Sequence, residues 1–303
     1  MKKLLFLSIA CMIVLAVAAF TGSSEDRINN RDRAGFVVGN HHFHPNIFFE
    51  PQWFGGKDAG NPGEGVPGII GGAVVPHHLL AHELMGQVFA ELAHQEPSLV
   101  IIVGPNHFNK GARILTSLWA WETPFGMVEV DNQIADEVLK LSLVQRNDQV
   151  FSTEHSMGNL MPFVKYYLPE AKVLPIILHY DVTWQEAKAL GEHLAALAEK
   201  ERAGAVIIAS VDFSHYLTRK EAEAKDAETI TALKAKNMGR IFAMGNDYLD
   251  SPASIGVIFA AMDRMGCKEF EILANTNSGI ILGNDLIETT SYITMLFYHQ
   301  NKI

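Results

Sequence analysis

The sequence predicts a single α/β domain with a mostly parallel central sheet flanked by helices, because apolar strand-like runs alternate with helical patterns from Gly68 onward. Ile69–Val75 and Leu99–Val103 are apolar, β-branched runs, and Leu79–His94 between them has helical periodicity. A strand, a helix and a strand in this order form a βαβ unit with a right-handed crossover. We therefore expect these two strands to be adjacent and parallel.

The same alternation continues to the C-terminus. Further strands are expected at Val173–Leu178, Ala205–Ser210, Glu271–Ala274 and Ser291–Tyr298. Further helices are expected at Asn132–Leu143, Met157–Tyr167, Trp184–Lys200, Arg219–Met244 (in one or two pieces) and Pro252–Met265. The last helix has the clearest ends, because Ser251 suits the N-cap, Pro252 the first turn and Gly266 the position just past the end.

The composition is that of a packed globular protein. The 303 residues are 48% hydrophobic and 19% charged, which is enough for one large domain. The formal net charge is −10, and it becomes −12 when Lys2 and Lys3 of the N-terminal leader are left out. A nucleic-acid surface needs clustered Lys and Arg, so this balance argues against a nucleic-acid partner.

Residues 1–20 have the pattern of a targeting segment. Lys2 and Lys3 precede 17 mostly apolar residues from Leu4 to Phe20, and Ala16-Val17-Ala18 fits a cleavage site. Seventeen residues is also close to the lower limit of a membrane span, so a cleaved signal peptide and a membrane anchor both stay open. In either case we expect an extracytoplasmic protein, secreted or anchored by residues 4–20, with no other membrane contact.

Residues 21–67 predict an irregular linker or cap, and residues 68–303 the folded domain. The linker is rich in Gly, Pro, Ser and Asn, and it holds three histidines, His41, His42 and His44, whose role the sequence leaves open. Cys11 lies in the leader, so Cys267 is the sole cysteine of the rest of the chain. An intrachain disulfide and a cysteine-based zinc site are therefore excluded there.

Histidines follow the first two predicted strands, at the edge where ligands bind in open α/β sheets. His77 comes after the strand at 69–75 and His107 after the strand at 99–103, so we expect their rings to lie side by side. Histidine is the commonest metal ligand and the usual acid–base group near neutral pH. The alternative is a pair of loop histidines bonded to backbone carbonyls.

Four further acidic or histidine residues are candidates. Asp212 and His215 follow the apolar run at 206–211, and a carboxylate that orients a histidine is a recurring arrangement for a tuned base, although Asp212 could instead cap a turn. His155 stands beside Glu154 ahead of a predicted helix, where Glu154 could simply be a cap. Asp250 precedes the N-cap of the last helix, where the helix dipole favours any acid.

These motifs resemble those of the Memo family, whose bacterial members are often called AmmeMemoRadiSam system protein B. The resemblance spans about Gly68 to Phe297 and rests on Pro76-His77, Gly104–His107, Glu154–Ser156, Asp212–His215, Trp121–Gly126 and Ser254–Gly256. It implies a fold similar to that of the class III extradiol dioxygenases, which are non-haem iron enzymes with the site at strand ends.

The resemblance also implies a metal site. In the family two histidines and a later cysteine cluster, and the matching positions here are His77, His107 and Asp250. Two histidines and one carboxylate suit Fe(II), whereas a cysteine would favour softer metals, so the implied cofactor is a divalent metal, Fe(II) ahead of Cu or Zn. His215, oriented by Asp212, would then be the general base, with His155 polarising the other side of the substrate.

Three functions follow from this reading of the sequence. The first is an iron-dependent oxidoreductase of dioxygenase-like type that acts on a hydroxyl-bearing small molecule. The second is a non-enzymatic module that binds a metal and a small-molecule or peptide ligand in the histidine-lined crevice, since a fold does not fix a function. The third is metal-assisted hydrolysis, which needs the same ligands and a water. The sequence identifies neither the substrate nor the oligomeric state.

Overall fold

The computed structural model describes residues 43–47, 49–54, 68–201 and 204–300. The predicted leader, its cleavage or anchoring, and the histidines at 41 and 42 lie outside these residues. Within the described ranges, no helix is both long and apolar enough to cross a bilayer.

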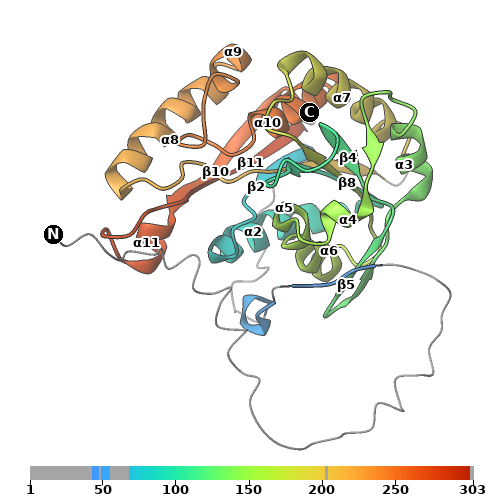
Figure 1. The fold of residues 1–303 in the computed structure, drawn as a ribbon, viewed down its shortest axis with the longest axis horizontal. Helices are drawn as coiled ribbons and strands as arrows, with labels where there is room; N and C mark the ends of the chain where they lie inside the picture. The colour runs from blue at the N-terminus through green and yellow to red at the C-terminus, as the bar shows by residue number, and fades with distance from the viewer. Residues whose placement is uncertain (1–42, 48, 55–67, 202–203, 301–303) are drawn as a thin grey trace, which may run out of the picture. The chain divides into compact units, whose positions relative to one another are not determined.

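A large mixed sheet forms the centre of the domain (Figure 1). In the described part of the chain it has eight strands in the order β10-β11-β2-β9-β3-β8-β4-β7. Their bounds are β2 Gly68–Val75, β3 Leu99–Pro105, β4 Ile114–Thr116, β7 Gln145–Arg146, β8 Lys172–Leu178, β9 Ala205–Ser210, β10 Glu269–Asn277 and β11 Ser291–Gln300. The four central strands, β2, β9, β3 and β8, are parallel, while β11 and β4 flank them in antiparallel register. The predicted α/β class is therefore confirmed.

The expected adjacency of β2 and β3 is wrong. Strand β9 lies between them and pairs in parallel with both, with Ile207 opposite Gly72 on one side and Ile101 on the other. The crossover through α2 therefore skips one strand position. A βαβ spacing gives the direction of two strands but does not reveal a third strand from later in the chain.

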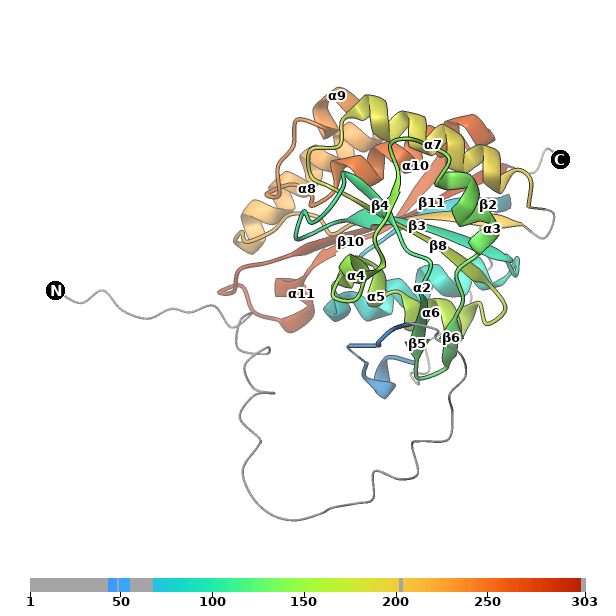
Figure 2. The same ribbon diagram turned by 45° about the vertical axis from the view of Figure 1, so that its right-hand side comes forward.

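Helices cover both faces of the sheet, as Figure 2 shows. The helices α7 (Trp184–Ala198) and α10 (Pro252–Met265) pack against each other on one face, and α2 (His82–Ala93) and α6 (Met161–Tyr167) on the other. The close approach of α7 and α10 depends on Gly191, because a Cβ at that position would collide with the backbone carbonyl of Val257. Further helices are α3 (Asn132–Val138), α4 (Asp148–Phe151), α8 (Arg219–Lys234) and α11 (Ser278–Leu282).

Several predicted helices are shorter or divided. The helix expected at 157–167 is two helices, α5 (His155–Gly158) and α6, and Pro162 occupies the first turn of α6, where a missing N–H costs nothing. The helix expected at 219–244 breaks after α8, where Lys236 takes a positive φ of 51°. Asn237 then caps the short helix α9 (Met238–Ile241).

A second, smaller sheet was not predicted. Strand β1 (Phe43–His44) pairs in parallel with β5 (Ala120–Thr123), which pairs with β6 (Gly126–Val128). His44 is fully buried there and hydrogen-bonds to the hydroxyls of Ser117 and Ser152. The described member of the histidine cluster therefore packs inside the protein.

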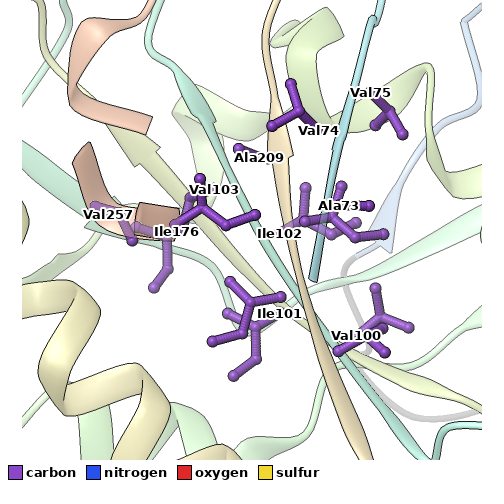
Figure 3. Close-up of a cluster of buried hydrophobic side chains, with 14 of the residues drawn as sticks. Ala73, Val74, Val75, Val100, Ile101, Ile102, Val103, Ile176, Ala209 and Val257 are labelled. Atoms are coloured by element: carbon purple, nitrogen blue, oxygen red, sulfur yellow. The ribbon is translucent and has the colours of Figure 1, made fainter. Parts of the chain in front are cut away.

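The hydrophobic core lies on the central strands (Figure 3). Beyond their first residues, the side chains of β2, β3, β8 and β9 are buried, as are those of α10 that face them. The labelled members are Ala73, Val74, Val75, Val100, Ile101, Ile102, Val103, Ile176, Ala209 and Val257. A parallel sheet covered on both faces needs such continuous β-branched runs, and its rigidity fixes the loops at the strand ends.

Candidate metal centre

The loops that follow three neighbouring strands meet at the carboxyl edge of the sheet. His77 follows β2, Asp212 follows β9 and His107 follows β3. The ring centroids of His77 and His107 are 5.1 Å apart, and those of His107 and His155 are 4.0 Å apart. Asp250, just ahead of α10, directs its carboxylate at both His77 and His107. The intervening strand thus does not keep the two histidines apart.

A chain of hydrogen bonds fixes the ring of His77. The Ser210 hydroxyl donates to the carbonyl oxygen of Ser156 over 2.7 Å. Because a hydroxyl has one hydrogen, Ser210 must accept from the Nδ1–H of His77, 3.0 Å away. The Nε2 atom of His77 then faces the carboxylates of Asp212 and Asp250, at 3.5 and 3.2 Å. This is the tautomer and orientation that a metal-binding histidine needs.

Glu154 fixes the ring of His107 in the same way. Its buried carboxylate accepts the backbone N–H of His107 at 2.9 Å and the Nδ1–H at 2.7 Å. It also accepts the N–H of Ser156, so it caps α5 as well, as its position ahead of a helix suggested. The Nε2 atom of His107 is left 3.7 Å from the Oδ2 atom of Asp250.

Asp250 is held at the centre by its own backbone and by the start of α10. Its N–H donates to the carbonyl oxygen of Asp212 at 3.1 Å, and the next residue, Ser251, is the N-cap of α10. Its Oδ2 atom faces both histidines, while its Oδ1 atom is buried with no hydrogen-bond partner in the described part of the protein. A buried carboxylate oxygen without a partner destabilises the folded protein unless a hydrogen-bond donor or a cation binds to it.

Opposite charges shift the protonation of this cluster. Burial alone would lower the pKa of His107, but the nearby carboxylates of Asp250 and Glu154 outweigh it and raise the pKa to about 10. Burial also disfavours a charged His77, yet Asp212 and Asp250 raise its pKa. For Asp250, burial favours the neutral acid, but the charges of His77 and His107 hold its pKa well below the usual range. The carboxylates therefore require positive charge at the Nε2 side of both rings.

His155 has the opposite electrostatic character. Burial lowers its pKa to about 4, and the charges of His107 and His77 act in the same direction. Its ring stacks on that of His107 at an angle of 21° and is neutral near pH 7. His77, His107 and His155 form one possible metal-binding group, and His77, Asp212 and Asp250 form a second, with ligand atoms within 4.8 Å of one another in each.

The predicted pairing of Asp212 with His215 is not formed. Within the described residues no hydrogen bond joins them, because the Oδ1 atom of Asp212 accepts the backbone N–H groups of His77 and His78, at 3.1 and 3.4 Å. His215 donates its backbone N–H to Asn246, and its Nδ1 atom is buried without a partner in the described protein. Asp212 thus positions the loop of His77 and does not orient the ring of His215.

Sequence reasoning missed Ser210, the last residue of β9. It is fully buried at the end of an apolar strand and fixes the tautomer of His77. A serine that ends an otherwise apolar strand is the signal that could have identified it, because a buried hydroxyl needs a partner.

The residues present fit a divalent metal ion. The donor set combines the Nε2 atoms of His77 and His107, at which a metal ion could replace a proton, with a carboxylate that has one unpartnered oxygen. Each imidazole has its second nitrogen anchored, by Ser210 or Glu154. A divalent cation would also supply the positive charge that the carboxylates require, in place of protons.

The fold and this cluster define a mixed α/β protein with a candidate histidine–carboxylate metal site at the ends of parallel strands. A sequence profile described as Memo-like protein matches residues 62–296. The chain belongs to this family.

Curated relatives agree with this assignment. A MEMO1 family protein of Pyrobaculum aerophilum is 30% identical over 235 residues, 75% of this chain and 83% of the relative. MEMO1 family proteins of Aquifex aeolicus and Methanopyrus kandleri are 30% and 31% identical over 74% and 76% of this chain, and 84% of each relative.

The fold is also found among solved structures. One of them is an uncharacterized protein from Escherichia coli K12 with a TM-score of 0.52 and 12% identity, and the match covers 74% of this chain and 99% of that one.

Proposed function

We propose that this protein is a metal-dependent oxidoreductase of dioxygenase-like type that holds one Fe(II) ion through His77, His107 and Asp250. The supporting observation is that both histidines direct Nε2 at the same oxygen of Asp250, over 3.2 and 3.7 Å. When bound, an iron ion in a two-histidine, one-carboxylate set supplies redox chemistry with open positions for substrate and O₂.

The remaining side chains would bind and orient a hydroxyl-bearing substrate. His155 is neutral near pH 7, because burial lowers its pKa to about 4, so it can polarise a substrate oxygen by a hydrogen bond without bringing in further charge. His215 has a buried Nδ1 atom with no partner in the described residues and is the base in this proposal. Asp212 acts indirectly, by holding the backbone of His77 and His78.

One observation supports a second candidate, a non-enzymatic module that binds a metal and a small-molecule or peptide ligand. Asp212 does not orient His215, so the carboxylate–histidine pair expected of a tuned base is missing from the described structure. The metal ligands are nevertheless anchored by Ser210 and Glu154, which a binding site also requires.

Metal analysis of the purified full-length chain tests both candidates. We expect about one iron per chain after anaerobic purification, lost in His77→Ala and Asp250→Ala and retained in His215→Ala. Oxygen uptake with catechol-type substrates, present in the parent and absent in His215→Ala, would support the oxidoreductase. Bound metal with no oxygen uptake would favour the binding module. Metal content that is indifferent to both His77→Ala and Asp250→Ala would contradict the site itself.

We propose further that the protein works outside the cytoplasm, secreted or anchored through residues 4–20. The support is the basic start, the apolar stretch and the Ala16-Val17-Ala18 pattern of the sequence. Cell fractionation with N-terminal sequencing of the product tests this. A mature chain that starts near residue 19 indicates export, an intact chain in the membrane fraction indicates anchoring, and an intact chain in the cytoplasm contradicts both.

A further inference from the structure

A cavity of about 540 Å³ opens beside the metal centre. It lies at the carboxyl ends of β3 and β8 and at the start of α10, on the side away from β2. His107 and Asp250 belong to its wall, whereas His77 and Asp212 do not. Two of the three proposed metal ligands therefore face this space directly.

One wall of the cavity is apolar. It carries the side chains of Trp184, Phe242, Met244 and Leu249, and the rings of Trp184 and Phe242 lie 5.8 Å apart. Phe242 packs tightly against α10, because a Cβ at Gly256 would lie 2.8 Å from its ring. The glycine thus lets the end of the ring approach the helix closely, and a larger residue would displace it.

Several polar groups elsewhere in the lining are already engaged. Asp181 accepts hydrogen bonds from Arg113 and His179, and the side-chain oxygen of Asn109 accepts the backbone N–H of Tyr180. Among the described residues that line the cavity there is no Lys or Arg, and the acids are Asp181 and Asp250. Away from His107 and the proposed metal ion, an anionic ligand body would find no Lys or Arg to pair with there.

We propose that this cavity binds an uncharged ligand with two parts. The larger part, the body, is apolar or aromatic and fills the cavity, and the smaller part, the head, is polar and binds the metal. The head reaches His107 and Asp250, and the body lies against Trp184 and Phe242. The volume is in the range of cavities that hold drug-sized ligands, about 300–1,000 Å³. This inference rests on the proposed metal centre, and it adds the class of molecule that the centre receives.

Hydroxamic acids of increasing size test this proposal, because they share one metal-chelating hydroxamate group and differ only in the hydrocarbon attached to it. Acetohydroxamic, benzohydroxamic and 4-phenylbenzohydroxamic acid are titrated calorimetrically into the metal-loaded full-length protein. The dissociation constant should fall at least about tenfold from the smallest to the largest probe, since each ring removes apolar surface from water. Trp184→Ala and Phe242→Ala should abolish this size dependence and leave the affinity for acetohydroxamic acid unchanged.

Two controls separate this result from a folding defect. Trp53→Ala removes another partly buried indole, which stacks on His82 outside the cavity, and it should leave the size dependence intact. Trp184→Phe keeps an aromatic wall and should give an intermediate result. Size-independent binding of all three probes would overturn the cavity proposal while leaving the metal centre in place. No binding of any probe to protein shown to contain metal would overturn both.

Discussion

Glu154 binds both N–H groups that His107 turns toward it, the backbone amide at 2.9 Å and the ring Nδ1–H at 2.7 Å. The same carboxylate accepts the N–H of Ser156 at the start of α5. One buried side chain therefore joins the loop after β3 to the helix that carries His155, and the ring of His107 has a single orientation.

Replacing Glu154 by glutamine should weaken metal binding by about 10- to 100-fold, the usual cost of losing a partner that orients a metal-binding histidine. Glutamine keeps the shape but lacks the charge that supports the Nδ1–H of His107. Competition with a chromophoric chelator measures the affinity. Glu83→Gln, an exposed acid in the first turn of α2, is the matched control and should change nothing. Equal affinities in the two variants would contradict the role of Glu154.

Asp250→Cys should change which metal the site prefers. A thiolate is a soft ligand, so the variant should bind less Fe(II) and more Cu(I) or Zn than the parent protein. The measurement is the metal content after equilibration with an equimolar mixture under anaerobic conditions. Asp250→Ala, which offers no ligand, should bind less of every metal. An unchanged metal ratio in Asp250→Cys would mean that residue 250 does not coordinate the ion.

The buried, neutral ring of His44 should make the free energy of unfolding fall in mild acid. Burial lowers its pKa to about 4 in the folded protein, from an unfolded value near 6.5. The unfolded chain therefore binds more protons between these values, so the contribution of His44 is complete above pH 6.5 and is lost as the pH falls toward 4. The full effect is of the order of 3 kcal/mol. Urea unfolding at pH 7.5 and pH 5 should show a smaller pH dependence in His44→Gln, and identical pH dependences would contradict the assignment.

Asp226 should matter more for stability than its place on a polar helix suggests. It is buried on α8 and accepts hydrogen bonds from Ser214 and Ser291, at 2.7 and 2.6 Å, and from Asn275 at 2.8 Å. Asp226→Ala leaves these donors unpaired and should cost roughly 2–4 kcal/mol of unfolding free energy. Urea unfolding measures it. Glu223→Ala, an exposed acid on the same helix, should cost less than about 0.5 kcal/mol, and similar losses in both would contradict this account.

The sequence predicted best those elements whose first and last residues are typical cap residues. Helix α10 begins at Pro252 and ends before Gly266 as expected, because the cap residues act locally. Strands β4 and β7 were missed because three and two residues are too short to show a period.

The site was predicted less completely, because its partnerships join distant segments. His77 and His107 meet as expected, but the strand between them is β9, which no local pattern places there. The spacing of Asp212 and His215 suggested a pair. The carboxylate of Asp212 instead accepts the backbone N–H groups of His77 and His78, which lie more than a hundred residues earlier in the chain. Such choices depend on packing across the sheet, which only the folded structure shows.

The position of β9 has a consequence for the order in which the protein can be made. The two strands that carry His77 and His107 leave the ribosome before the strand that must lie between them, and Asp250 leaves later still. An incomplete chain therefore cannot hold these two strands in their final places, and any early pairing of β2 with β3 must open again to admit β9. The proposed ligand set comes together only after residue 250 has been synthesised, so a nascent chain would offer no complete site at which the wrong metal could bind.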